Sequence, residues 1–220
     1  MIHLFALLSL LLCGVCYTGF QNSSHFHNTG NRRSLLLLVF GGALLLRLLL
    51  AYTTHGFSND IACFAAWADR IFTLGPGQFY SAEMFTDYPP GFMYVLYLIG
   101  ALRSLLQIPY YSDLHILLLK LPAILCDIAC GFLLYRVAVK RLHFSDLQGI
   151  FAASAYLFQP AVILNSSCWG QVDSVYTLMI ILMCLFLMKG NLLPAYAVYG
   201  LGVLLKPQML IFTPVLLAGI

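Results

Sequence analysis

The least apolar stretch of the chain is residues 57–91, FSNDIACFAAWADRIFTLGPGQFYSAEMFTDYPPG, which lies between two strongly apolar runs. Four of the eight acidic residues occur in this stretch, at Asp60, Asp69, Glu83 and Asp87. A connection of this length between two membrane-spanning segments is uncommon unless it is functional. We therefore predict that this stretch carries the functional site.

The first half of the stretch has the pattern of an amphipathic helix. Apolar residues recur at helical spacing from Ile61 to Phe72. Ser58 is predicted to cap this helix, and the sequence Gly75-Pro76-Gly77 is predicted to end it. We expect the helix to lie in the plane of the membrane interface, with Asp60 at the level of the lipid headgroups.

The composition indicates an integral membrane protein. Of the 220 residues, 61% are hydrophobic and 9% are charged, whereas a soluble domain carries about 25% charge. We predict an all-α, multi-pass transmembrane bundle of about seven or eight apolar segments. The net charge of +3 is too small for a nucleic-acid-binding protein. The seven cysteines mostly lie in apolar runs, which favours packing over a metal or redox role.

The chain divides into two parts. Residues 1–33 form an apolar segment and a polar linker, and residues 34–220 form the transmembrane module. Arg32 and Arg33 favour a cytoplasmic linker, which would place the 57–91 stretch outside. With spans at 34–53, 91–106 and 114–139, Lys140 and Arg141 would also lie outside, against the positive-inside rule. Either one segment is re-entrant or the charge bias is too weak to decide.

The last apolar run, residues 209–220, is short for a span. As a helix it would be about 18 Å long, against a hydrocarbon core of about 30 Å. We therefore expect a truncation within this element, and a chain that inserts into the membrane but transfers no group by itself.

Several ionisable residues lie inside apolar runs, where charge is costly. Arg47, Lys120 and Arg136 are predicted to extend their charged ends to an interface. Asp127, in the middle of an apolar run, is predicted either to pair with a neighbouring helix or to line a polar cavity.

Two carboxylates, Asp60 and Asp87, bracket the amphipathic helix and form a candidate site with aromatic residues between and beside them. Each also has a simpler interpretation, as a helix-start residue and as a turn residue. Trp67 and Tyr88 offer flat apolar faces, either for stacking a ring of a substrate or for anchoring at the membrane interface. Further along, Trp169-Gly-Gln-Val-Asp173 is either a polar turn or part of the same site. Lys206, beside Pro207, either extends to an interface or binds a phosphate.

These residues carry a resemblance to a known family. The order Asn59-Asp60, Asp87-Tyr-Pro-Pro-Gly91, Trp169-Gly-Gln-Val-Asp-Ser174 and Lys206-Pro-Gln208 is similar to that of the bacterial relatives of the mannosyltransferase that adds the second mannose to GPI anchors. These proteins belong to the GT-C class of multi-pass glycosyltransferases. The resemblance covers residues 34–220, and a fainter one exists to the dolichyl-phosphate-glucose-dependent glucosyltransferases. Members of the family are longer than this chain, and residues 2–20 precede the helix that comes first in them.

The resemblance implies transfer of a mannose-like hexose, with inversion, from a polyprenyl phosphate to a glycan or glycolipid on the extracytoplasmic face. It implies Asp60 as the catalytic base. No cofactor is expected apart from the lipid-linked donor, and a divalent metal is left open. The expected location is the plasma membrane in a bacterium, or the endoplasmic reticulum membrane in a eukaryote. The substrate-binding candidates, from the motifs and from the neighbouring aromatic and basic residues, are Asn59, Trp67, Arg70, Asp87, Tyr88, Trp169, Gln171, Asp173, Lys206 and Gln208.

A transporter or flippase subunit is the main alternative, with Asp127 and helix breaks near Gln171 and Pro207 as its cues. An inactive fragment or a structural membrane subunit is a third possibility. A transporter would concentrate polar groups at mid-bilayer. This chain concentrates them in one outer loop, which favours the enzyme.

Overall fold

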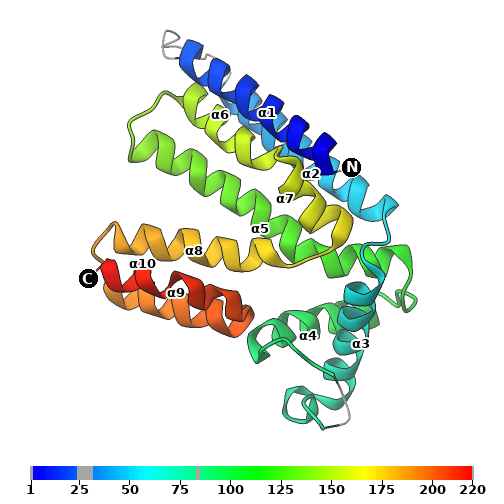
Figure 1. The fold of residues 1–220 in the computed structure, drawn as a ribbon. Coiled ribbons are helices and arrows are strands. Elements are labelled where there is room, and N and C mark those ends of the chain that lie inside the picture. Colours follow the sequence, from blue (N-terminus) through cyan, green and yellow to red (C-terminus); the bar gives the residue numbers. More distant parts are fainter. Residues whose placement is uncertain (1, 24–31, 83–84, 220) are drawn as a thin grey trace.

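The computed structural model describes residues 2–23, 32–82 and 85–219, and the regular elements within these ranges are all helices (Figure 1). The all-α prediction is therefore confirmed. The polar linker is predicted at 21–31; its first three residues belong to α1, and residues 24–31 and Glu83 lie outside the described residues. In chain order the elements are α1 (Ile2–Ser23), α2 (Arg32–Thr53), α3 (Ser58–Leu74), η1 (Pro76–Gln78), α4 (Pro90–Leu105), α5 (Asp113–Lys140), α6 (Asp146–Leu157), α7 (Pro160–Ile163), η2 (Leu164–Trp169), α8 (Asp173–Leu187), α9 (Leu192–Leu205), η3 (Pro207–Phe212) and α10 (Thr213–Ala218).

Most of these helices pack side by side as a bundle with α5 at its centre. Helix α5 packs against α2, α6 and α8, while α1 packs on α6 and α9 packs on α8. Among the described residues, two helices, α2 and α5, are long and apolar enough to cross a membrane. A third span results if α6 and Pro160–Trp169, which meet at a bend of 51°, count as one. The prediction of seven or eight spans is not confirmed by helix length.

The outer surface of α2 is apolar. Leu37 and Leu38 are 75% and 72% exposed, and Leu45 and Leu49 are also exposed. Contiguous apolar surface of this kind marks a membrane or protein contact rather than a surface in water. A lipid environment fits this surface.

Helix α3 confirms the predicted amphipathic helix but begins differently. Its N-cap is Phe57, without a side-chain cap bond, and Ser58 is the first helical residue. The prediction of Ser58 as the cap is therefore wrong. The helix start is instead fixed by a distant segment, because the Phe57 N–H donates to the carbonyl of Trp169 at 2.9 Å. As predicted, the helix ends at Gly75, where φ is +82°.

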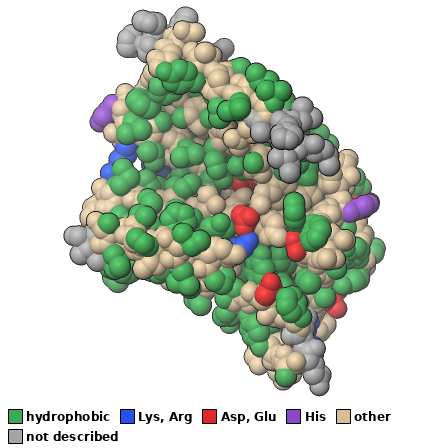
Figure 2. Space-filling model, viewed as in Figure 1, with side chains coloured by type: hydrophobic (Ala, Val, Ile, Leu, Met, Phe, Trp, Pro, Cys, Tyr) green, Lys and Arg blue, Asp and Glu red, His purple; other side chains and the backbone are tan. Residues whose placement is uncertain are grey.

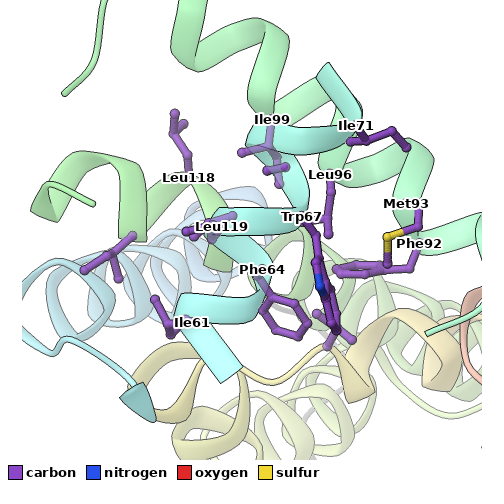
Figure 3. Close-up of a cluster of buried hydrophobic side chains, with 14 of the residues drawn as sticks. Ile61, Phe64, Trp67, Ile71, Phe92, Met93, Leu96, Ile99, Leu118 and Leu119 are labelled. Atoms are coloured by element: carbon purple, nitrogen blue, oxygen red, sulfur yellow. The ribbon is translucent and has the colours of Figure 1, made fainter. Parts of the chain in front are cut away.

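The apolar face of α3 is buried against other helices. Figure 3 shows Phe64, Trp67 and Ile71 pointing into a cluster with side chains that include Phe92. Gly100 of α4 lies so close to α3 that a Cβ there would stand 2.5 Å from the carbonyl oxygen of Ala68. The pattern that predicted contact with the membrane interface therefore serves protein packing. Figure 1 shows α3 running crosswise to α5 and α8.

Helix α4 begins at Pro90, as predicted, but it does not run from one end of the bundle to the other. Gly91 lies against the backbone of Leu204 at the end of α9. The other end of α4 leads to Asp113, whose carboxylate is 3.5 Å from the Nδ1 of His55, just after α2. Both ends of α4 therefore lie on the side that carries α3. The prediction of a third span at 91–106 is wrong, because an apolar helix of this length can be covered by protein as well as by lipid.

This path removes the topological conflict in the sequence. Since α3 and α4 stay on one side, α2 and α5 run in opposite directions with nothing crossing between them. The N-terminal end of α2 then lies beside the C-terminal end of α5, and Arg32 is 3.3 Å from Asp146 of α6. Six of the eleven basic residues gather at this end, which we call the basic end: Arg32, Arg33, Arg136, Lys140, Arg141 and Lys189.

Two of the three residues predicted to extend to an interface are instead fully buried. The Nε of Arg47 lies 3.3 Å from Asp127, and both side chains have zero exposure. Lys120 donates to the carbonyl of Thr54 at 2.6 Å and to that of Ala51 at 3.2 Å. Their predictions are wrong, because partners on neighbouring helices replace water. The predicted pairing of Asp127 with a neighbouring helix is confirmed.

Candidate functional site

Four segments far apart in the sequence line one cavity of about 540 Å³. They are the first turns of α3, residues 85–88, Gln171, and the break between α9 and η3. Figure 2 shows acidic side chains close to a basic one near the middle of this face. The lining residues are Asp60, Cys63, Phe64, Trp67, Phe85, Asp87, Tyr88, Gln171, Lys206, Pro207 and Gln208.

The segment that follows α7 is folded to face Asp60. Residues Leu164–Trp169 have a π-helical turn, which is frequent at functional sites. Gly170 ends it with φ +89°, a conformation that glycine adopts without strain. The N–H groups of Gly170 and Gln171 both donate to the carbonyl of Asn165, at 3.1 and 2.9 Å. This turn directs the side chains of Trp169 and Gln171 toward the start of α3.

Asp60 is held by one of its two carboxylate oxygens. Oδ2 accepts from the Nε1 of Trp169 at 3.0 Å and from the Nε2 of Gln171. Among the described residues, no hydrogen bond or ion pair is found for Oδ1. The carboxylate is thus fixed in orientation while one oxygen remains able to accept a proton. Its position in the first turn of α3 also suits a negative charge.

Lys206 lies on the opposite wall of the cavity. It is 8% exposed, and its backbone is extended between α9 and η3, at the break that Pro207 predicted. Nζ forms an ion pair with Asp173 and lies 3.4 Å from the Oε1 of Gln171. It also stands 5.7 Å from the ring centroid of Tyr88. Of the two interpretations of Lys206, the structure supports the inward-facing cation.

Gln171 links the two walls. Its Nε2 donates to Asp60, and its Oε1 faces both Lys206 and the hydroxyl of Tyr88, at 3.4 Å each. Burial, followed by the nearby carboxylates of Asp173, Asp87 and Asp60, raises the pKa of Tyr88 well above its ordinary value. The Tyr88 phenol is therefore a neutral hydrogen-bond donor at physiological pH.

The other predicted residues differ in how they are placed relative to the cavity. Asp87 is exposed at the rim of the cavity, and Gln208 lines it. Trp67 lines the cavity but is 2% exposed, with its Nε1 bonded to the carbonyl of Phe85 at 3.1 Å. Trp67 therefore has little free face on which a sugar ring could stack.

Trp169 and Asp173 contact lining residues without lining the cavity themselves, and two further predicted residues are not brought to it. The Nε of Arg70 donates to the carbonyl of Phe79 at 3.0 Å, and its NH2 group donates to Ser81. Arg70 thus fixes the loop after α3 and does not line the cavity. Asn59 is exposed beside Asp60 and does not line it either.

Sequence reasoning missed two residues that support the site. Asn165 donates to the Oδ2 of Asp173 at 2.9 Å, and Tyr176 places its ring 5.7 Å from the Nζ of Lys206. Asn165 precedes the Trp169–Asp173 motif by only four residues, and this closeness in the sequence could have indicated that it belongs to the site. Tyr176 follows Asp173 by three residues in α8, which is the spacing of one helical face.

The site carries more negative than positive charge. Asp60 and Asp87 line the cavity, whereas Lys206 is the one basic side chain among the described residues of the lining and is already paired with Asp173. Within the part of the chain that the structure describes, no three His, Cys, Asp or Glu side chains are grouped so that they could hold a metal ion.

Comparison with family models, with curated proteins and with solved structures finds no match for this chain. The family suggested by the sequence motifs therefore stays a prediction, and the functional argument rests on the geometry of the cavity.

Proposed function

We propose that this chain is a membrane glycosyltransferase of the GT-C class. It moves a hexose such as mannose from a polyprenyl phosphate to a hydroxyl of a glycan or glycolipid, with inversion. The observation that carries the proposal is the state of Asp60, whose Oδ2 is held by two donors while Oδ1 faces no partner among the described residues. A fixed carboxylate with one open oxygen suits a general base.

The proposed reaction needs one proton acceptor and one stabilised leaving group. Asp60 takes the proton of the acceptor hydroxyl as its oxygen forms a bond to the anomeric carbon. The bond between that carbon and the phosphate oxygen breaks on the opposite face, and polyprenyl phosphate leaves with one more negative charge. Such a displacement inverts the configuration at the anomeric carbon.

Lys206 is the residue that would meet the developing phosphate charge. Its partner Asp173 would compete with the phosphate, so donor binding requires Lys206 to share or exchange this ion pair. The neutral hydroxyl of Tyr88 and the amide of Gln171 stand beside it as uncharged partners. This arrangement predicts a donor affinity that depends on Lys206 more than on any other cavity residue.

The basic end of the bundle indicates how the protein is oriented in the membrane. The positive-inside rule favours a cytoplasmic position for Arg32, Lys140, Arg141 and Lys189. The cavity would then open on the extracytoplasmic side, in the plasma membrane of a bacterium or the endoplasmic reticulum of a eukaryote. We infer that α1, α8 and α9, which are also apolar, complete a multi-pass bundle with α2 and α5.

Asp127 is one of the residues that suggested the alternative function, a transporter or flippase subunit. That carboxylate is fully buried and accepts hydrogen bonds from Tyr156 at 3.1 Å and Ser174 at 2.5 Å, besides its ion pair with Arg47. A group with this many fixed partners is better suited to holding helices together than to passing a substrate. The enzyme is therefore the favoured function.

Vesicles containing the purified whole protein, a labelled polyprenyl-phosphate hexose and a membrane glycolipid extract distinguish the two. The enzyme hypothesis predicts labelled product together with an equal amount of free polyprenyl phosphate. Movement of intact donor across the bilayer, without cleavage of the sugar–phosphate bond, would instead establish the transporter.

A further inference from the structure

A second site lies at the basic end, on the opposite side of the bundle from the cavity. Between the start of α2 and the end of α5 is a small cavity of about 170 Å³, which we call the head cavity. It is lined by Arg32, Leu36, Phe132, Tyr135, Arg136, Val139 and Lys140. Three cations thus meet apolar and aromatic side chains in one recess.

An apolar groove adjoins the head cavity. It also runs between α2 and α5, has a volume of about 530 Å³, and shares Leu36 and Phe132 with the head cavity. The shared residues place the two spaces side by side. The groove is lined by Leu36, Leu37, Phe40, Gly41, Leu125, Ile128, Ala129 and Phe132.

The charges of the head cavity are not balanced within the protein. Arg32 pairs with Asp146, which also accepts from the hydroxyl of Tyr135 at 2.7 Å. In the ranges that the structure describes, neither Arg136 nor Lys140 has an ion pair or a side-chain hydrogen bond. The guanidinium carbon of Arg136 lies 5.9 Å from the ring centroid of Phe132. Two cations are therefore left for an external anion.

We propose that this bipartite surface binds an anionic diacyl phospholipid of the surrounding bilayer. Its phosphate meets Arg136 and Lys140, and one acyl chain lies in the groove. Basic recesses between membrane helices on the cytoplasmic side suit such headgroups. The apolar groove selects a lipid over a soluble phosphate, since a small anion gains nothing from it. This site is independent of the sugar-transfer reaction.

Two adjacent glycines provide a matched pair of variants for the groove. Gly41 lines it and Gly42 does not. A Cβ added at either position would have no heavy atom within 4 Å, so each accepts a larger side chain without a clash there. Gly41→Leu fills the groove, whereas Gly42→Leu adds the same side chain one residue away on the same helix.

The head cavity has a similar pair. Arg136→Gln with Lys140→Gln removes the two unpaired cations. Arg33→Gln with Lys189→Gln removes the same charge from the same end but from residues outside the head cavity.

Native mass spectrometry of the detergent-purified chain, titrated with phosphatidylglycerol or phosphatidylcholine, tests the proposal. We expect phosphatidylglycerol to bind at least about tenfold more tightly than phosphatidylcholine, because the choline cation of phosphatidylcholine offsets the phosphate charge and is repelled by Arg136 and Lys140. Gly41→Leu and the Arg136/Lys140 variant should each lose about tenfold, and their matched controls should not.

Equal binding of the two lipids would overturn the proposal. So would equal effects of Gly41→Leu and Gly42→Leu, because the groove would then have no part in binding. Displacement of bound phosphatidylglycerol by millimolar glycerol phosphate would show a site for small anions and would also contradict a lipid site.

Discussion

Replacing Asp127 by Asn tests whether the buried Arg47–Asp127 pair stabilises the bundle through its charge or only through its hydrogen bonds. Asp127 accepts from Arg47, Tyr156 and Ser174, so it connects α2, α5, α6 and α8. Hydrogen bonds between membrane helices are worth about 0.6 kcal/mol each on average. Because Asn keeps an acceptor oxygen, hydrogen bonding alone predicts a loss below about 1 kcal/mol.

The charge predicts a larger loss. Without the carboxylate, the guanidinium of Arg47 is left in a site with zero exposure and no counter-charge. Isolating one member of a buried ion pair costs about 3–5 kcal/mol. We therefore expect Asp127→Asn to lower the free energy of unfolding by about 3 kcal/mol, measured by titration of the purified protein with SDS in mixed micelles.

The controls isolate the charge. Asp113→Asn removes an exposed carboxylate from the same helix and should change stability by less than about 0.5 kcal/mol. The double variant Arg47→Met with Asp127→Leu removes both charges and should recover most of the loss. A loss below about 1 kcal/mol for Asp127→Asn would refute the reasoning and leave hydrogen bonding as the main term.

Three further predictions concern the cavity. Lys206→Gln should raise the dissociation constant for a polyprenyl-phosphate sugar about tenfold, because it loses a charge-assisted contact to the phosphate. Lys206→Arg keeps that contact and should retain part of the affinity. Burial, followed by the charges of Asp87 and Asp60, raises the pKa of the Cys63 thiol. Because the thiolate is the reactive form, alkylation of Cys63 should be slow at neutral pH and accelerate as pH rises. Asp60→Asn should speed this alkylation, as measured by site-resolved mass spectrometry. Gly170→Ala should destabilise the protein by about 1–3 kcal/mol, because it strains a left-handed residue and places a Cβ 2.6 Å from the Cδ1 of Ile61.

Each of these has a control or a contrary outcome. Lys189→Gln removes a cation at the other end of the bundle and should leave donor affinity unchanged. Alkylation of Cys63 that is fast at pH 7 and insensitive to Asp60→Asn would contradict the electrostatic argument. Gly190→Ala, at φ +71° with no heavy atom within 4 Å of its Cβ, carries the backbone strain without the clash. It should therefore cost less than Gly170→Ala.

The sequence predicted the helical class, the amphipathic α3 and most of the residues that line the cavity. These features depend on composition, on spacing and on short motifs, all of which are local. The start of α3 could not be predicted, because it is fixed by a backbone hydrogen bond from Phe57 to Trp169, a residue more than a hundred positions away in the sequence. The placement of Arg70 could not be predicted either, since its partners belong to a loop whose path only the fold decides.

Helix α4 and the buried cations show a second reason why parts of the fold could not be predicted from the sequence. An apolar helix has the same composition whether lipid or protein covers it, so the sequence of α4 predicts a span. Charge in an apolar run is costly without a partner, so the sequence predicts that Arg47 and Lys120 reach an interface. Their partners, Asp127 and the carbonyl groups of Ala51 and Thr54, come from other segments of the chain. Only the packing of α2 against α5 reveals them.

The most direct test of the account compares binding and chemistry in Asp60→Asn. The amide keeps an acceptor for Trp169 and Gln171, so the cavity should hold its shape while losing its base. With the whole protein reconstituted in vesicles, we expect donor binding within about threefold of wild type and a transfer rate at least about a hundredfold lower. Asp113→Asn should transfer at the wild-type rate. Near wild-type transfer by Asp60→Asn, at unchanged donor affinity, would contradict the assignment of Asp60 as the catalytic base.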